Sequence, residues 1–179
     1  MSANAPQSSS VSPLAPWQPG DIVPAPLDIY SCRVEQEWVD YNGHMTEAAY
    51  LSAFGWGSDA LFTYIGDNDA YRAAGNSFYT VETHIVYEDE AFLNDPLRIT
   101  TRVLDVDAKR LQIHHTMYNG DSGRRLSTTE QMLVHVDMNA GKSSPILPHV
   151  AAALSAIHIS HSSLPTPEDV GRVMKIKKH

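Results

Sequence analysis

Residues 38–50 have the sequence WVDYNGHMTEAAY, and this stretch carries the pattern that decides the fold. An alternating run ends at Asp40, a short polar turn containing Gly43 follows, and a long helical pattern begins near Thr46. The N–H groups at the start of a helix lack intrahelical partners, and the helix dipole favours negative charge there. A carboxylate beside free N–H donors can act as base or nucleophile while the donors stabilise an oxyanion. We therefore predict the active site around Asp40.

The composition indicates a single soluble globular domain. The chain has 179 residues, 42% of them hydrophobic, and a formal net charge of -8 with acidic and basic residues intermixed. Such a charge balance argues against nucleic-acid binding. The single cysteine, Cys32, excludes an intrachain disulfide, favours a cytoplasmic location and is expected to pack in the core. No apolar run reaches the roughly 18 to 20 residues that span a bilayer, so we expect no membrane insertion.

The rest of the chain predicts one long helix and several antiparallel strands. A strand is expected over residues 30–39 and a helix over residues 46–65, with Thr46 as the N-cap. Four further strand patterns follow at residues 78–91, 97–106, 111–118 and 125–137 with little helical signal between them, and Asn119-Gly120 favours a hairpin turn. This order predicts an α+β protein in which a curved sheet of five to six antiparallel strands wraps around the helix, an arrangement that resembles the hotdog fold.

Small residues on the expected helix indicate a close contact with the sheet. Ala49, Ala53 and Gly57 recur four residues apart, and Gly55 lies beside them. Each glycine costs about 1 kcal/mol relative to alanine in a helix interior. Close approach of the helix to a broad surface such as a wrapped sheet would explain why both are present.

Two flanking segments differ from this domain in composition. Residues 1–28 hold six of the eleven prolines and no lysine or arginine, which predicts a flexible arm that Trp17 could anchor. Residues 29–145 form the expected domain. Residues 146–179 predict a C-terminal helical extension, with a short helix over residues 150–157 and a helix start at Thr166-Pro167-Glu168-Asp169.

Four separate blocks of the chain resemble one enzyme family. Asp40 and Tyr50 have the spacing seen in hotdog-fold thioesterases of the 4-hydroxybenzoyl-CoA thioesterase type. The blocks EWVDYNGHMTEAAYL, YTVETHI, DAKRL and EQMLVHVD resemble the betainyl-CoA thioesterases of L-carnitine breakdown, which occur alone or fused behind an L-carnitine dehydrogenase. The resemblance covers roughly residues 30 to 145. The chain has no nicotinamide-binding GxGxxG segment, so dehydrogenase activity is not expected here.

The resemblance implies hydrolysis of a short acyl-CoA thioester, with betainyl-CoA as the leading substrate. Asp40 would attack the carbonyl or activate a water, and the sequence leaves both roles open. The N–H near Glu47 would hold the oxyanion, and His44 would orient Asn42, Asp40 or the thioester oxygen. No metal ligand cluster stands out, and no cofactor is expected beyond the coenzyme A of the substrate.

Further candidates come from the strand patterns. Glu130 falls on a mostly apolar face of the last strand, where a carboxylate is costly unless it is paired or functional. It is predicted to be catalytic, with an ion pair to Arg98 or Arg102 as the structural alternative. Glu82 and His84 share a face of the second strand and are candidate substrate-binding residues, although such a pair is more often solvated.

Aromatic side chains could bind the acyl group. A betainyl group carries a trimethylammonium, which aromatic faces and a nearby carboxylate stabilise. The candidates are Trp38, Tyr50 and Trp56, with Tyr79 and Tyr87 as further possibilities, although aromatic residues at such spacings usually pack in the core. The candidates for the coenzyme A phosphates are Arg98, Arg102, Lys109, Arg110, Arg124 and Arg125.

Two other functions fit parts of the pattern. Hotdog hydratases also use an aspartate and a histidine about four residues apart near a helix start, a spacing that Asp40 and His44 satisfy. A non-catalytic acyl-CoA-binding protein is the third alternative. In each case a single hotdog sheet leaves an edge and a face uncovered, so we expect a homodimer or a homotetramer.

Overall fold

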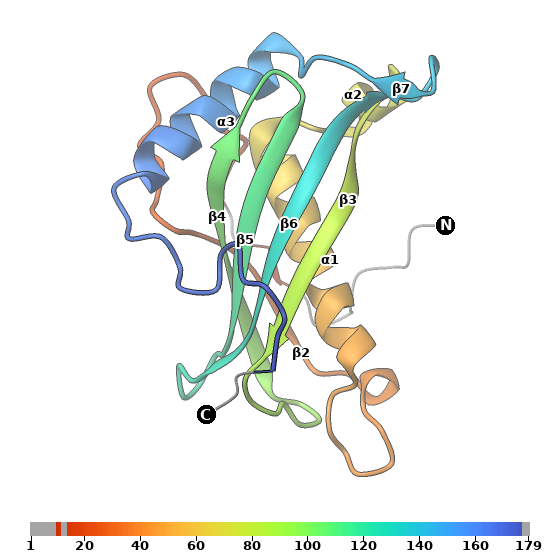
Figure 1. Cartoon of the computed structure of the whole chain (residues 1–179), viewed down its shortest axis with the longest axis vertical. Helices are drawn as coiled ribbons and strands as arrows, with labels where there is room; N and C mark the ends of the chain where they lie inside the picture. Colours follow the sequence, from red (N-terminus) through yellow and green to blue (C-terminus); the bar gives the residue numbers. More distant parts are fainter. Residues whose placement is uncertain (1–9, 12–13, 177–179) are drawn as a thin grey trace.

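The computed structural model describes residues 10–11 and 14–176 and shows a curved antiparallel sheet wrapped around one helix (Figure 1). Helix α1 (Glu47–Ile65) packs on one face of the sheet. The strands are β1 (Ser10–Val11), β2 (Leu27–Arg33), β3 (Asn76–Tyr87), β4 (Pro96–Val106), β5 (Arg110–Asn119), β6 (Arg125–Asp137) and β7 (Lys142–Ser143). Their order is β1-β2-β4-β5-β6-β3, with β7 beside β6. The predicted α+β hotdog architecture is confirmed.

Three further helices complete the described chain: a 3-10 helix at Gln36–Trp38, α2 (Asp69–Ala73) and α3 (Pro148–His161). Helix α3 packs against β4 and α1. No helix within the described ranges is long and apolar enough to cross a bilayer. In the same ranges, no group of three or more His, Cys, Asp or Glu side chains is placed to hold a metal ion.

Helix α1 begins where the sequence predicted and packs as its small residues indicate. Thr46 occupies the N-cap position, and Phe54 and Leu61 are fully buried. A Cβ added at Gly57 would lie 3.2 Å from Ile99 Cγ2 on β4, so the helix does approach the sheet closely there. Gly55 is exposed and has no atom within 4 Å of such a Cβ. The close-approach explanation is therefore right for Gly57 and wrong for Gly55.

Strand β2, the first strand that the sequence predicted, differs from its predicted range. It spans Leu27–Arg33 rather than residues 30–39, so it does not lead directly into Asp40. The chain instead turns through the 3-10 helix, and the Trp38 ring stacks on Trp56 of α1 with centroids 5.2 Å apart. The stack of these two partly buried indole rings holds the turn against α1.

The described part of the N-terminal segment contacts its own chain. The backbone N–H of Trp17 donates to the Tyr64 carbonyl at 2.8 Å, and the Trp17 side chain is partly buried against the core. The Ser160 hydroxyl of α3 donates to the Val23 carbonyl at 2.9 Å. The rest of the predicted arm, residues 1–9 and 12–13, lies outside the described residues.

The expected helix start at Thr166 is only a turn, and this prediction is wrong. Gly171 has a positive φ of 68° that interrupts a right-handed helix. The Asp169 carboxylate, which would favour a helix start, instead accepts hydrogen bonds from Thr128 Oγ1 at 2.6 Å and lies 3.0 Å from His114 Nε2. The segment after α3 therefore lies across the sheet face opposite α1 (Figure 1).

The core contains polar networks that the sequence analysis missed. His115 is fully buried, with Nε2 3.0 Å from the Ser58 hydroxyl and Nδ1 2.8 Å from the Thr101 hydroxyl. Burial lowers the pKa of His115 to about 3. The neutral imidazole thus joins α1 to β4 and β5 through two hydrogen bonds.

Candidate active site

The turn before α1 is closed by the Asp40 carboxylate. Its Oδ1 accepts hydrogen bonds from the N–H groups of Asn42 at 2.8 Å and His44 at 3.1 Å. Gly43 adopts a φ of 79°, and its N–H donates to the Asp40 carbonyl at 3.0 Å. The hydrogen bond from the His44 N–H, followed by that from Asn42, lowers the pKa of Asp40 below its ordinary value. Asp40 is therefore a carboxylate at neutral pH.

The start of α1 presents free backbone donors. The Thr46 side chain makes no capping hydrogen bond, and the backbone hydrogen bonds of the helix begin with the N–H groups of Ala49 and Tyr50, which donate to the Thr46 carbonyl. Among the described residues, the N–H groups of Glu47 and Ala48 have no acceptor. Such donors, together with the positive end of the helix dipole, are suited to stabilise a negative oxygen.

A cavity of about 400 Å³ opens at this helix start. It brings together three of the predicted site residues, His44, Glu47 and Tyr50. The remaining lining comes from Met45 and from the end of β3 and the segment after it: Tyr87, Glu88, Asp89 and Glu90. Nothing in the alternation of strand residues marked these three consecutive acids.

Tyr50 fixes the acidic segment against the helix. Its hydroxyl donates to the Asp89 carbonyl at 3.1 Å and accepts from the Ala91 N–H at 3.0 Å. The side chain is 4% exposed, and burial raises the pKa of the phenol. Tyr50 was predicted to bind substrate, and the structure shows that its polar atom is fully used in positioning the cavity wall.

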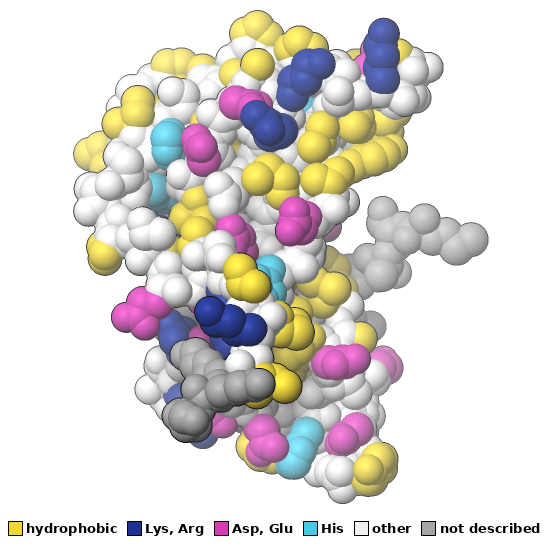
Figure 2. Space-filling model, viewed as in Figure 1, with side chains coloured by type: hydrophobic (Ala, Val, Ile, Leu, Met, Phe, Trp, Pro, Cys, Tyr) yellow, Lys and Arg dark blue, Asp and Glu magenta, His cyan; other side chains and the backbone are white. Residues whose placement is uncertain are grey.

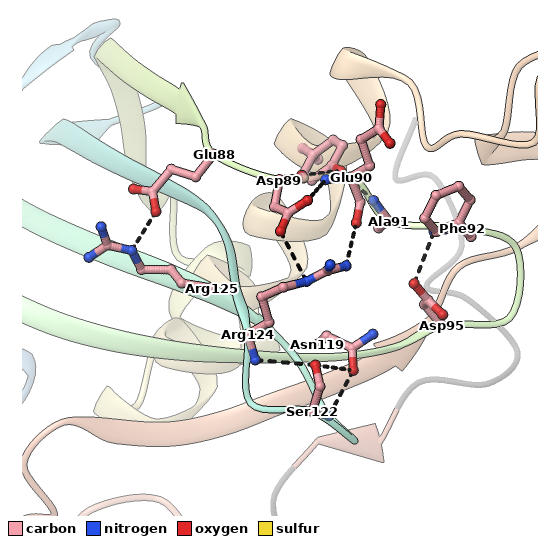
Figure 3. Close-up of polar contacts among 11 residues, drawn as sticks. Glu88, Asp89, Glu90, Ala91, Phe92, Asp95, Asn119, Ser122, Arg124 and Arg125 are labelled. Carbon is pink, nitrogen blue, oxygen red and sulfur yellow. Dashed lines mark hydrogen bonds and ion pairs between the residues drawn. The ribbon is translucent and has the colours of Figure 1, made fainter.

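Arg124, in the turn between β5 and β6, and Arg125, the first residue of β6, contact the same segment (Figure 3). Arg124 Nε lies 3.0 Å from Asp89 Oδ2, and its Nη2 donates to the Glu90 carbonyl at 3.2 Å. Arg125 Nε lies 2.5 Å from Glu88 Oε2. Two of the three acids are therefore paired with arginine, and the Glu90 side chain is the exception.

Glu90 and Glu47 are the cavity carboxylates without an arginine or lysine partner among the described residues. The nearest group that can carry positive charge is the His44 ring, with Nδ1 3.6 Å from Glu90 Oε1. The His44 ring also packs edge-on against Phe92, with centroids 5.0 Å apart. His44 thus faces Glu90 rather than the Asp40 carboxylate, to which only its backbone N–H donates.

Several predicted residues lie outside the cavity lining. Asp40 and Asn42 lie in the adjacent turn. Along the chain, one residue separates Asn42 from His44, which lines the cavity. Trp38 and Trp56 stack on each other on the side of α1 and are not lining residues.

Glu82, His84 and Glu130 lie on the sheet face opposite α1. A bulge at Val81 shifts the register, so that Glu82 pairs with Met132 and His84 pairs with Glu130. Glu130 Oε1 accepts from Gln112 Nε2 at 2.6 Å, and Oε2 accepts from the Gly171 N–H at 2.7 Å. Glu130 therefore holds the C-terminal segment, and its side chain does not line the cavity.

The expected arginine partners of Glu130 have other contacts. Arg98 pairs with Asp28 at 3.0 Å. Arg102 donates to the carbonyl of Pro165 at 2.7 Å and also contacts those of His161 and Leu164. The alternative of an ion pair between Glu130 and either arginine is wrong, because both guanidinium groups lie on other partners.

Comparison with known proteins identifies the family. The family model of the thioesterase-like superfamily matches residues 34–154. A betainyl-CoA thioesterase of Pseudomonas aeruginosa is 41% identical over 149 residues, covering 83% of this chain and 94% of that protein. An L-carnitine dehydrogenase/betainyl-CoA thioesterase of Rhizobium meliloti is 46% identical over 147 residues, covering 82% of this chain. This chain spans only 30% of the length of the latter.

Solved structures have the same fold. A Pseudomonas putida KT2440 protein provisionally described as a thioesterase is 31% identical, with a TM-score of 0.74 and coverage of 86% of this chain and 98% of that chain. A hypothetical protein of Staphylococcus aureus, solved in complex with CoA, has the same TM-score at 24% identity and covers 82% of this chain and 93% of that chain. The helix start, the Asp40 turn and these matches lead to one conclusion: the chain belongs to the thioesterase-like superfamily.

Proposed function

We propose that this protein hydrolyses a short acyl-CoA thioester, with betainyl-CoA as its substrate and glycine betaine and free CoA as its products. The observation that carries the proposal is the cavity at the start of α1, where free backbone donors, an ionised aspartate in the adjoining turn and an acidic, aromatic wall occur together. Relatives of 41% and 46% identity bear the betainyl-CoA thioesterase name.

In the proposed reaction, the thioester carbonyl oxygen lies against the N–H groups of Glu47 and Ala48. Negative charge develops on that oxygen as the tetrahedral intermediate forms, and fixed donors stabilise it without reorganisation. Asp40 supplies a carboxylate that either attacks the carbonyl or activates a water. Collapse of the intermediate breaks the C–S bond and releases CoA as a thiol after proton transfer.

Asp40 can act as the nucleophile or as the base that activates a water, and hydrolysis in heavy-oxygen water distinguishes these two roles. Under single turnover in labelled water, label in the protein indicates a covalent anhydride intermediate. Label found solely in the product acid indicates an attacking water. His44 and Asn42 would position this turn, since their backbone N–H groups hold Asp40 Oδ1.

We place the phosphates of coenzyme A in a second cavity of about 580 Å³ that shares Glu88 with the first. Its basic lining residues are Arg125, Arg172 and Lys175. Of the other expected candidates, Arg98, Arg110 and Arg124 are paired with Asp28, Asp107 and Asp89. Arg125 is also ion-paired, with Glu88, but it is the arginine among these candidates that lines the cavity.

We propose that the protein works as a homodimer or a higher oligomer built on the β3 edge. Strand β3 is 12 residues long and lies at the end of the sheet, so no other strand of the described residues pairs with its outer backbone groups. Tyr79 and Val81 on this strand are 53% and 61% exposed. They border a groove with Val134, Val136 and Met138, and hydrophobic side chains gather in this part of the surface (Figure 2).

A thiol-release screen over short acyl-CoAs, with and without a quaternary ammonium, tests the proposed function. We expect betainyl-CoA to release CoA thiol fastest. Crotonyl-CoA serves as the comparison, because loss of its enoyl absorbance without thiol release would instead indicate hydration. His44 faces Glu90 rather than the Asp40 carboxylate, which disfavours the paired aspartate and histidine that hydration would use.

A further inference from the structure

The cavity at the start of α1 has walls of different chemical character. Its lining includes Glu47 at the helix start, with its free backbone N–H, and also the side chains of Tyr87 and Glu90. In a betainyl thioester the quaternary nitrogen is only two bonds from the carbonyl carbon. Any group that recognises this nitrogen must therefore line the same cavity as the donors that hold the carbonyl oxygen.

The charges of the cavity wall are not equivalent. Asp89 is paired with Arg124 and Glu88 with Arg125, so neither has free charge to offer a ligand. Glu90 has His44 Nδ1 at 3.6 Å as its nearest charged or chargeable neighbour, and its backbone is fixed by Arg124 at the carbonyl and by Asp89 Oδ1 at the N–H. The backbone of Glu90 is thus fixed, while its carboxylate has no arginine partner among the described residues. A site for a cation requires a carboxylate of this kind.

An aromatic ring lines the same cavity as this carboxylate. The Tyr87 ring packs edge-on against Tyr50, with centroids 5.4 Å apart and an interplanar angle of 79°. The Tyr87 hydroxyl donates to the Glu47 carbonyl at 3.2 Å, which fixes the ring beside the helix start. Since 45% of the side chain stays exposed, part of the ring is accessible from the cavity. A trimethylammonium has no N–H to donate, so aromatic surface and an unpaired anion are the groups that can select it.

We propose that Glu90 and the Tyr87 ring form the subsite for the quaternary ammonium of a cationic acyl group. This inference rests on the proposed function and goes beyond it, because it identifies how the cation is distinguished from a neutral group of the same shape. Tyr50 is the positioning residue of the subsite, since its hydroxyl holds the segment on both sides of Glu90.

Binding of two thioether analogues tests the subsite independently of hydrolysis. The cationic probe is S-(2-trimethylammonioethyl)-CoA and the neutral probe is S-(3,3-dimethylbutyl)-CoA, which differ by a nitrogen replaced by carbon. Neither has a carbonyl, so neither can be hydrolysed. Calorimetry on the whole chain gives the ratio of the two dissociation constants. We expect the wild type to prefer the cation and Glu90→Gln to reduce that preference about tenfold, chiefly by weaker binding of the cationic probe.

Three further variants separate local recognition from general effects. Tyr87→Leu should lower the preference several-fold, whereas Tyr87→Phe, which keeps the ring, should lower it less. Glu37→Gln removes one negative charge from the exposed 3-10 helix outside the cavity and should leave the ratio within twofold. The wild-type preference should also weaken as ionic strength rises.

The outcomes distinguish the subsite from the enzyme activity. An unchanged ratio in Glu90→Gln, or an equal loss in Glu37→Gln, overturns the subsite even if betainyl-CoA is hydrolysed. A ratio that falls in Glu90→Gln and not in Glu37→Gln supports it even if no thioester is cleaved, and in that case the proposed hydrolysis fails while cation recognition stands.

Discussion

The Asp40 carboxylate has a structural role beside its proposed chemical one. Its Oδ1 closes the turn through the N–H groups of Asn42 and His44. An asparagine at this position can still accept those bonds through its amide oxygen while losing the negative charge. The change Asp40→Asn therefore separates the chemical role of this residue from its role in the turn.

The Tyr50 hydroxyl is expected to contribute to both stability and binding. Tyr50→Phe leaves the Asp89 carbonyl and the Ala91 N–H without their partner, which should cost about 1–3 kcal/mol in the free energy of unfolding. Because the segment that carries Glu90 loses an attachment, KM for the cationic thioester should rise more than kcat falls. Urea unfolding and steady-state kinetics check the two effects, and unchanged values in both would contradict this role.

The buried His115 should make stability depend on pH. In the unfolded chain its pKa returns to the ordinary value of 6.5, whereas burial lowers it to about 3 in the folded protein. Between these values only the unfolded state binds the proton, so this contribution is complete above pH 6.5 and is lost as the pH falls. Lowering the pH from 6.5 to 5 should cost roughly 2 kcal/mol from this group.

The matched variant for this pH effect is His115→Gln, whose amide can still contact Ser58 and Thr101 but does not titrate. Urea unfolding of both proteins at pH 8, 6.5 and 5 gives the difference in slope. His161, whose pKa burial also lowers, is present in both and its contribution cancels. Parallel pH profiles for the two proteins would show that His115 is not the group responsible.

At the level of elements, α1 contains two glycines, Gly55 and Gly57, whose surroundings differ. Gly55→Ala meets no neighbour and should stabilise the protein by about 0.5–1 kcal/mol through helix propensity. Gly57→Ala places a methyl group 3.2 Å from Ile99 Cγ2, so overpacking should cancel or exceed that gain, by about 1–3 kcal/mol. Thermal and urea unfolding of the pair compare them directly. Equal stabilisation by both changes would disprove close packing at Gly57.

The strand patterns predicted the sheet better than they predicted its faces. Alternation placed Tyr79, Val81, Ile85 and Tyr87 on one face, but the bulge at Val81 puts Tyr79 opposite Val134 on the outer face. Tyr87 lies beyond the bulge, beside Tyr50 of α1. One inserted residue moves every side chain before it to the other face of the sheet. The alternating sequence pattern does not show where such a bulge occurs.

The site was predictable where it depends on local chain geometry. The helix start, Thr46 at the N-cap and the closeness of His44, Glu47 and Tyr50 to one cavity follow from residues within one turn and one helix. Glu88, Asp89 and Glu90 reach that cavity through contacts of Tyr50, Arg124 and Arg125, which come from distant parts of the chain. Such contacts depend on strand order, so no local pattern predicts them.

At the level of the whole molecule, the open β3 edge predicts self-association. One chain has a mass of 19.8 kDa, so light scattering should give about 40 kDa for a dimer or about 80 kDa for a tetramer. Val81→Lys places a charge on the exposed edge and should shift the protein toward the monomer mass. A wild-type protein that is fully active at the mass of a single chain would contradict the proposed assembly.

The central claim is that Asp40 and the start of α1 together cleave a CoA thioester. Thiol release from betainyl-CoA, measured for the wild type and for Asp40→Asn at matched folded concentration, tests it most directly. We expect the variant to retain the fold and to lose about 10²–10⁴-fold in kcat, the range for removal of a catalytic base or nucleophile. Release of CoA thiol by Asp40→Asn at the wild-type rate would contradict the account.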